Sequence, residues 1–372
     1  MNDQPELPYW LALRRAGLGS TNFALLISRF GSIAKAWETN AGELTRAGME
    51  AQYVRAVEKA RAGFDAGREL DALARLEARA TTWLDEDFPA SLRDIPQSPP
   101  VLFVRGKTGP AFDQAVAVVG TRRVTPYGRQ ACEFFCEALA RAGVAIVSGL
   151  ARGVDAIAHR VALEQGVPTV AVLAGGIDQV YPRENEGLAR RILEAGCLVS
   201  EYPAGIPARP DYFPRRNRIL SGLSKATLVI EAGEGSGALH TANWAFEQGR
   251  EVFAIPGSVF SKQSQGTNQL IRENTAKLVA TPEQLCEELN LLSASGQGRL
   301  MEGGSGAPAA TPRPAPTQDE GKVLHWLGEE PRHIDEIART SGMAISQLSG
   351  TLQLLELKGL VRQQRPMVFV RS

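Results

Sequence analysis

The segment AVAVVGTRRVTPYG (residues 115–128) decides the fold class of this 372-residue chain. Its first part, Ala115–Val119, is entirely apolar, and Gly120 follows it directly. A short, uniformly apolar run is typical of a strand that is covered on both faces of a sheet. Gly120 allows a close turn of the backbone, and Tyr127-Gly128 opens a stretch with helical spacing. The segment therefore predicts a buried strand, a tight turn and a covering helix.

The same pattern recurs on both sides of this segment, through residues 86–290. The strand-like runs are Val101–Val104, Ala115–Val119, Val144–Ser148, Thr169–Ala174, Cys197–Glu201, Ala226–Glu231 and Glu251–Ile255. The connections between most of them are long enough for a crossover helix, which parallel strands require. We therefore predict an α/β fold whose core is a Rossmann-like parallel sheet with helices on both faces.

The region before the core, residues 1–85, is predicted to be a wholly helical domain of the SAM or helix-hairpin-helix type. The expected helical segments are Tyr9–Arg15, Asn22–Phe30, Ser32–Glu38, Ala41–Ala47 and Ala51–Leu84. The turn Ala16–Ser20 fits a helix-hairpin-helix motif, whose backbone amides can hold a DNA phosphate. The same glycines suit any tight turn between packed helices, and the scarcity of Lys and Arg favours that simpler interpretation.

The region after the core divides into a linker and a small domain. Residues 291–317 are rich in Gly, Ala, Ser and Pro without an apolar period, which predicts a flexible linker. Residues 318–372 should form a winged-helix domain. Its expected elements are helices at Glu320–Leu327, Ile334–Thr340 and Ile345–Lys358, then strands at Leu360–Gln364 and Met367–Arg371. The last helix has a single Lys, so weak contact with duplex DNA and docking of a protein both remain open.

Composition narrows the class of protein further. Lys and Arg number 41 and Asp and Glu number 41, so the formal net charge is zero and any polyanion must be met by a local basic patch. Cys132 and Cys136 lie on a predicted amphipathic helix without metal-ligand spacing, so we expect buried thiols. Neither a secretion signal nor an apolar run of membrane-spanning length is evident, and we expect a cytoplasmic protein without membrane contact.

Loops that follow the predicted strands carry small and basic residues. Ligands of an open parallel sheet bind at the carboxyl ends of its strands, where these loops lie. The marked loops are Gly120–Arg123, Ser148–Asp155, Ala174–Gly176 and Gly233–Gly237. Several glycine-containing turns on one edge favour a phosphate-rich ligand. No loop has the Walker A pattern or the dinucleotide-binding G-x-G-x-x-G pattern, which disfavours a P-loop nucleotidase and a dinucleotide cofactor.

The segment Phe213–Arg218 (FPRRNR) is the densest basic feature of the chain. Guanidinium groups beside an aromatic ring suit a single nucleic-acid strand, because they can neutralise phosphates while the ring stacks on a base. A structural arginine cluster paired with Asp155, Glu201 or Glu231 is the alternative, and both interpretations can hold for different arginines. Arg122 and Lys262, on other loops, would extend the same patch.

Catalytic and metal-binding interpretations are weaker. His159, Asp155 and Ser148 resemble fragments of a nucleophilic triad, but no G-x-S-x-G elbow is present. Asp155 is better read as a helix cap and His159 as a hydrogen-bonded core residue. Glu231 at a strand end could act as a general base but has no evident carboxylate partner. The histidines are too scattered for a metal cluster.

Taken together, the motifs of residues 88–282 closely resemble those of the DprA/Smf family of DNA-processing proteins. The resemblance rests on Val119–Arg122, Tyr127-Gly128, Val147–Asp155, Ala158-His159, Tyr181-Pro182, Ser200–Pro203, Phe213–Arg218, Glu231-Ala232, Ser236-Gly237, Thr241-Ala242, Pro256-Gly257 and Gly266–Asn268. Thr121 stands where the family more often has Ser, which keeps the hydroxyl. Phe88-Pro89 stands where Tyr-Pro is usual, which removes any hydrogen bond from that phenol.

The resemblance implies a homodimeric, non-enzymatic protein that uses no cofactor. Such a protein binds single-stranded DNA, protects incoming or recombining strands and loads the RecA recombinase onto them in natural transformation and recombination. The family's strand pocket corresponds here to Gly120, Thr121, Arg122, Phe213, Arg216, Asn217 and Arg218. The loop and segment patterns add Ser148, Gly149, Arg152, Arg215 and Lys262 to the predicted contacts with single-stranded DNA.

Two other classes of function compete with this one. A phosphoribohydrolase of the lysine-decarboxylase-like (LOG) group shares a related core, but its P-G-G-x-G-T-x-x-E motif has no match in Gly233–Thr241, where the helix-start carboxylate is missing. A transcription regulator would read duplex DNA with residues 318–372, and the weakly basic recognition helix argues against it.

Overall fold

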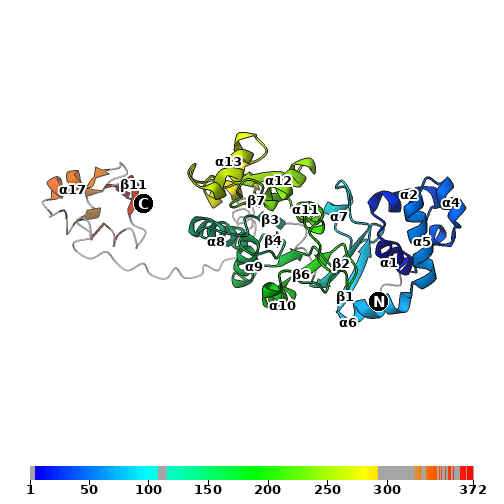
Figure 1. The fold of residues 1–372 in the computed structure, drawn as a ribbon. Coiled ribbons are helices and arrows are strands. Elements are labelled where there is room, and N and C mark those ends of the chain that lie inside the picture. The colour runs from blue at the N-terminus through cyan, green and yellow to red at the C-terminus, as the bar shows by residue number, and fades with distance from the viewer. Residues whose placement is uncertain are drawn as a thin grey trace, which may run out of the picture. The chain divides into compact units, whose positions relative to one another are not determined.

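The computed structural model describes residues 5–107 and 115–291 and, towards the C-terminus, residues 323–324, 326–327, 332–341, 343, 345, 348, 351–352, 355, 361–365 and 367–371. The chain divides into two compact units, Met1–Arg299 and Leu300–Ser372 (Figure 1).

A nine-stranded sheet forms the centre of the first unit, in the order β1-β2-β6-β5-β4-β3-β7-β8-β9. Its strands are β1 (Ala78–Thr82), β2 (Val101–Gly106), β3 (Ala115–Val119), β4 (Ala145–Ser148), β5 (Thr169–Val172), β6 (Cys197–Ser200), β7 (Ala226–Val229), β8 (Glu251–Ala254) and β9 (Lys277–Leu278). All pairings from β6 across to β9 are parallel. The predicted Rossmann-like core is therefore confirmed.

Helices cover both faces of this sheet. Alternate residues of a strand point to opposite sides, so an entirely apolar strand needs a cover on each face. Val116 and Val118 of β3 pack with α8 (Pro126–Arg141), α9 (Val154–Glu164) and α14 (Pro282–Glu288). Val119 packs on the other face, in a core that also contains residues of the helices α7, α11, α12 and α13 (Figure 1). These helices are α7 (Ala90–Arg93), α11 (Tyr212–Gly222), α12 (Gly237–Glu247) and α13 (Gln265–Arg272), and α10 (Glu186–Ala195) lies between β5 and β6 in sequence.

The N-terminal helices extend the core beyond the sheet. They are α1 (Leu7–Arg15), α2 (Ser20–Phe30), α3 (Ile33–Glu38), α4 (Ala41–Arg46), α5 (Ala51–Gly63) and α6 (Ala66–Arg75). Trp10 stacks on Phe23 with ring centroids 5.0 Å apart. Both belong to a cluster that also contains Val101 and Phe103 of β2, so the helices share one hydrophobic core with the edge of the sheet.

Two predictions about this edge were wrong. The expected helix Ala51–Leu84 breaks into α5, α6 and strand β1, which pairs antiparallel with β2. Glu77, with φ of 50°, ends the helical path, and the partners of the strand lie on β2, from Ala78↔Arg105 to Thr82↔Val101. Strand β2 also pairs antiparallel with β6, because an apolar run marks burial but not direction.

Several other observations concern single residues and segments. Cys132 and Cys136 are buried on α8, as predicted. Gly17, with φ of +89°, turns the chain between α1 and α2, where Leu18 is fully buried. Among the described residues, no helix has the length and apolar character needed to cross a bilayer.

The second unit contains β10 (Arg332–His333), α17 (Ile334–Ser341), β11 (Val361–Arg365) and β12 (Val368–Arg371). The strands form an antiparallel sheet in the order β10-β12-β11. The predicted helix at 334–340 and the two C-terminal strands are confirmed. The predicted linker (291–317) lies outside the described residues except for Leu291, and so do large parts of the helices predicted at 320–327 and 345–358.

Candidate functional site

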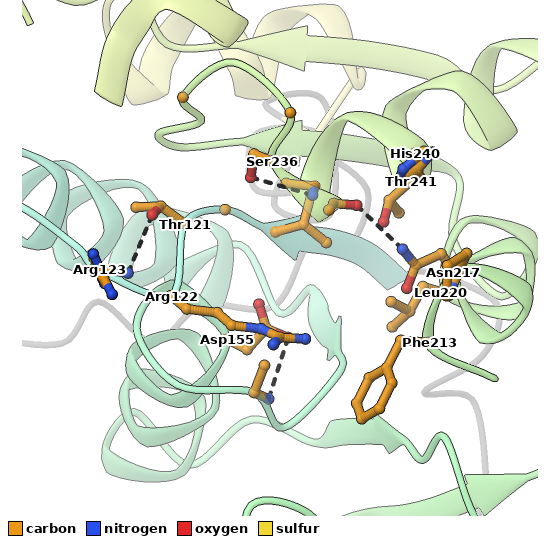
Figure 2. Close-up of a pocket in the computed structure, with 18 of the residues that line it drawn as sticks. Thr121, Arg122, Arg123, Asp155, Phe213, Asn217, Leu220, Ser236, His240 and Thr241 are labelled. Carbon is orange, nitrogen blue, oxygen red and sulfur yellow. Dashed lines mark hydrogen bonds between the residues drawn. The ribbon is translucent and has the colours of Figure 1, made fainter. Parts of the chain in front are cut away.

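A cavity of about 1180 Å³ opens at the carboxyl ends of β3 and β7 (Figure 2). The chain runs from β3 outward through β4, β5 and β6, then returns to place β7 on the other side of β3. The loops that follow β3 and β7 therefore diverge, as they do at the switch point of a doubly wound sheet. The cavity lies between these two loops and α11, in the place where such sheets bind ligands.

The loop after β3 is held in place by contacts with Val154 of α9 and with Glu231, which follows β7. A Cβ added to Gly120 would lie 2.5 Å from Val154 Cγ2, so only glycine fits there. The Thr121 amide donates to the Glu231 carbonyl at 2.7 Å, and the Thr121 hydroxyl accepts from the Arg123 amide at 3.1 Å. With its neighbours held in this way, Arg122 extends its side chain over the cavity (Figure 2).

The exposed Arg122 and the half-buried Phe213 lie side by side in the cavity. The Arg122 guanidinium carbon lies 5.4 Å from the centre of the Phe213 ring. Tyr181 approaches the same ring edge-on, with centroids 5.6 Å apart, and is 55% exposed. An accessible ring with a cation beside it can stack a planar base and neutralise the neighbouring phosphate.

The charged groups lining the cavity are mainly basic. Its lining cations are Arg122, Arg123, Arg216 and Lys262, and its lining carboxylates are Asp155 and Glu234. Burial raises the pKa of Asp155, against the opposing influence of Arg216, and the carboxylate accepts from the Gly149 and Ala151 amides at 3.1 and 3.3 Å. Asp155 thus stabilises the loop before α9. The exposed cations of the cavity, Arg122, Arg123 and Lys262, can meet a ligand.

Two predicted contacts on α11 lie at the back of the cavity. Arg216 is 4% exposed and donates to the carbonyls of Gly149, at 2.8 Å, and Val172. Burial lowers the pKa of Arg216 to about 10, while Asp155 opposes the shift. Asn217 accepts from Arg216 Nε at 3.2 Å and donates to the Gly237 carbonyl at 3.2 Å. Both side chains therefore connect α11 to the loops that surround the cavity.

Arg218 does not reach the cavity. Its guanidinium binds Glu201 through two hydrogen bonds of 2.9 and 2.8 Å, and Arg14 of α1 lies on the same carboxylate at 3.4 Å. Burial opposes the charge of Glu201, but Arg218 and Arg14 outweigh it and hold the pKa of the carboxyl below its ordinary value. We call Arg14, Glu201 and Arg218 the buried ion triad. It matches the structural alternative that the sequence left open.

The remaining predicted contacts are spread around the cavity. The buried Ser148 hydroxyl donates to the Val118 carbonyl at 2.6 Å, and a Cβ on Gly149 would lie 2.5 Å from the Arg216 guanidinium. Arg152 is exposed but donates twice to Glu184, at 2.7 Å each. Arg215 is exposed on α11 outside the cavity lining, whereas Lys262 is exposed and lines it.

The residues considered for catalysis have structural partners. His159 is fully buried, with Nδ1 2.7 Å from the Thr169 hydroxyl, and burial lowers its pKa to about 3. Thr169 in turn donates to the Ile146 carbonyl at 2.7 Å. Glu231 accepts from the Thr125 amide and hydroxyl at 2.9 and 2.6 Å, at the start of α8. His159 is the hydrogen-bonded core residue that the sequence favoured.

Sequence reasoning left several lining residues unassigned. Arg123, Tyr181, Ser236, His240 and Thr241 all line the cavity (Figure 2 shows all but Tyr181 by label). Each sits in or next to a loop that the sequence marked, so position at the carboxyl edge was the available signal. Among the described residues, no cluster of three or more His, Cys, Asp or Glu side chains could hold a metal ion.

Comparison with known proteins places this geometry in a family. Residues 79–290 match the family model of DNA recombination-mediator protein A, and residues 307–365 match the DprA winged helix domain. Protein Smf of Escherichia coli (strain K12) is 40% identical, over 74% of this chain and 73% of that protein. Protein Smf of Synechocystis is 33% identical, over 98% of this chain and 99% of that protein.

Solved structures agree with the sequence relatives. The crystal structure of DNA processing protein A from Streptococcus pneumoniae superposes with a TM-score of 0.66 at 32% identity, covering 76% of this chain and 97% of that one. DNA processing protein A from Helicobacter pylori, studied for its single-stranded DNA binding mode, superposes with a TM-score of 0.53 at 28% identity, covering 58% and 97%. With the matched domains, the sequence identities and this fold in agreement, the chain belongs to the DprA/Smf family of DNA-processing proteins.

Proposed function

We propose that this protein binds single-stranded DNA in the cavity between β3, β7 and α11, without catalysing a reaction on it. The observation that carries the proposal is the Arg122–Phe213 pair, a guanidinium 5.4 Å from an accessible ring at the ligand edge of the sheet. A ring stacks on any base and a guanidinium pairs with any phosphate, so binding should tolerate sequence. The Helicobacter pylori relative, studied for its single-stranded DNA binding mode, supports this proposal.

The proposed contacts fall into two groups. Gly120, Thr121, Arg122, Phe213 and Lys262 form the binding surface, with Arg215 as an exposed cation beside it. Ser148, Gly149, Arg216, Asn217 and Arg218 hold that surface in place through the bonds described above. Arg152 has its charge matched by Glu184 and contributes least.

Within recombination, we propose that the protein protects incoming or recombining strands and passes them to the RecA recombinase. We further propose that it acts in the cytoplasm as a homodimer and serves natural transformation where the host takes up DNA. The proposed division is residues 1–85, 86–290, 291–317 and 318–372, with the last part making at most weak contact with duplex DNA.

Binding of a fluorescent oligo-deoxythymidine at several salt concentrations tests the proposal. The wild type should bind with a steep salt dependence, because each neutralised phosphate of a single strand contributes a slope of about −0.7. Phe213→Ala should weaken binding while leaving that slope almost unchanged, because the ring carries no charge. An affinity that does not respond to salt would exclude the proposed site.

The phosphoribohydrolase alternative has a separate test. Purified protein incubated with nucleoside monophosphates should release no free base. Release of base that is lost in an Arg122→Ala variant would instead assign an enzymatic function to the cavity.

A further inference from the structure

The loop between β8 and α13 displays an apolar side chain that the fold does not use. Phe260 is 96% exposed and the adjacent Val259 is 79% exposed. Exposure of single apolar residues is common, but here a whole phenylalanine ring stands in solvent next to another apolar side chain and is available for contact with a ligand. The ring lies on the loop after β8, the strand next to β7, and so at the same edge of the sheet as the cavity.

Hydrogen bonds fix the conformation of this loop, so the backbone that carries Phe260 has a defined position. At its base, Asn268 of α13 accepts from the Gly257 amide at 3.1 Å and donates to the Gly257 carbonyl at 3.0 Å. At its tip, the Ser258 hydroxyl accepts from the Phe260 amide at 3.2 Å, and the Ser258 carbonyl accepts from the Ser261 amide at 3.0 Å. These bonds close the turn on itself and leave the Phe260 ring exposed to solvent.

The loop is continuous with the cavity wall. Lys262 and Gln263, next along the chain, line the cavity. A Cβ added to Gly233 of the loop after β7 would lie 3.1 Å from the Lys262 carbonyl, so the two loops are in contact. From Pro256 to Ile271 the sequence contains Lys262 and no Asp or Glu. An aromatic ring close to an exposed lysine suits a polyanion with stacking groups.

We infer that Phe260 is a second stacking platform for single-stranded DNA, for a base that lies outside the cavity. The inference rests on the proposed function and extends it: the strand runs from the Arg122–Phe213 pair past Lys262 to Phe260, along the carboxyl ends of β3, β7 and β8. The footprint on one protomer is therefore longer than the cavity. Phe260 contributes to affinity only when the strand is long enough to reach it.

The test compares two oligo-deoxythymidines, of about 4 and about 15 nucleotides, which span the site sizes of stacking-type binders. Phe260→Ala should weaken binding of the long strand by roughly 5- to 150-fold, the loss expected for one unstacked base, and leave the short strand unaffected. Phe260→Trp should keep the affinity, and its added indole fluorescence should be quenched by the long strand alone. Arg122→Ala should weaken both lengths.

Phe246→Ala is the matched control. Phe246 is 59% exposed near the C-terminal end of α12, whose N-terminal end faces the cavity. If Phe260→Ala binds the long strand as tightly as Phe246→Ala does, the inference is wrong, while the loss in Arg122→Ala still supports the strand site. If Phe260→Ala alters sedimentation but not strand affinity, the ring is a self-association surface and the inference is again wrong. If Arg122→Ala also binds both strands as tightly as the wild type does, the proposed function is wrong as well as the inference.

Discussion

The buried ion triad and the cavity use arginine in opposite ways. The segment Phe213–Arg218 contributes a residue to each, Arg218 to the triad and Phe213 to the cavity. In the buried ion triad, Arg218 is 6% exposed and two of its hydrogen bonds go to one carboxylate. At the cavity, Phe213 offers its ring to the exposed Arg122. A buried guanidinium must be fully paired or the fold suffers, whereas an exposed one keeps its charge for a ligand. The difference teaches that burial, and not residue type, separates the arginines that hold this protein together from those that stay available to a ligand.

The largest effect should come from breaking the buried ion triad. Arg218→Ala leaves Glu201 buried with Arg14 as its remaining ion-pair partner among the described residues, and removal of one partner from a buried pair costs about 3–5 kcal/mol. The free energy of unfolding, measured by denaturant titration, should fall by that amount. Arg215→Ala, three residues away and exposed, is the control and should leave the unfolding midpoint unchanged. Equal stability of the two variants would contradict the distinction between the regions.

Acid should destabilise the protein through His159, a second buried group. The folded state binds a proton on His159 only near pH 3, while the unfolded chain binds one near pH 6.5. As the pH falls from 6 to 4 the unfolded state therefore gains the proton first, and stability drops by roughly 2–3 kcal/mol from this residue. His159→Gln should remove that part of the pH dependence.

Thr169→Val serves as the control for this measurement. It removes the hydrogen-bond partner of His159 but leaves the ring buried, so the protein should be less stable yet keep the same response to pH. A His159→Gln variant whose unfolding free energy varies with pH as the wild type's does would rule out the buried neutral imidazole.

A smaller effect, and on binding alone, is expected at the cavity. Arg122→Ala should lower the affinity for a single strand by about 10-fold and reduce the salt slope by about 0.7, since one phosphate contact is lost. Its denaturation midpoint should match the wild type. Loss of stability comparable to that of Arg218→Ala would place Arg122 with the structural arginines.

The smallest effect is expected at Arg152, which is exposed like Arg122 but already paired with Glu184. Arg152→Ala should change neither the denaturation midpoint nor the affinity for a strand beyond experimental error, because exposed ion pairs contribute little. Isothermal titration calorimetry, run in parallel on Arg122→Ala, measures the affinity, and denaturant titration measures the midpoint. A 10-fold loss of affinity in Arg152→Ala would extend the binding surface beyond the cavity.

Much of the fold could be predicted because it depends on local patterns of apolar residues and on the lengths of the connections between them. Apolar runs such as Ala115–Val119, and helix-length connections, marked the parallel strands correctly. The edge of the sheet could not be predicted in this way. The Ala-rich stretch that ends at Leu84 has helical character locally, but residues 78–82 gain their hydrogen bonds from β2, and partners across the fold outweigh local propensity.

By itself the sequence determined the Rossmann-like core, the family motifs and the edge at which a ligand would bind. These follow from short-range features: periodicity, glycine turns and the position of loops after strands. Only the tertiary structure decided which arginines are available to that ligand. Arg215, Arg216 and Arg218 lie within one helical turn or so, yet the first is exposed, the second bonds to main-chain carbonyls and the third pairs with Glu201. These bonds of Arg216 and Arg218 go to groups 17 to 67 residues away along the chain, which no local pattern specifies.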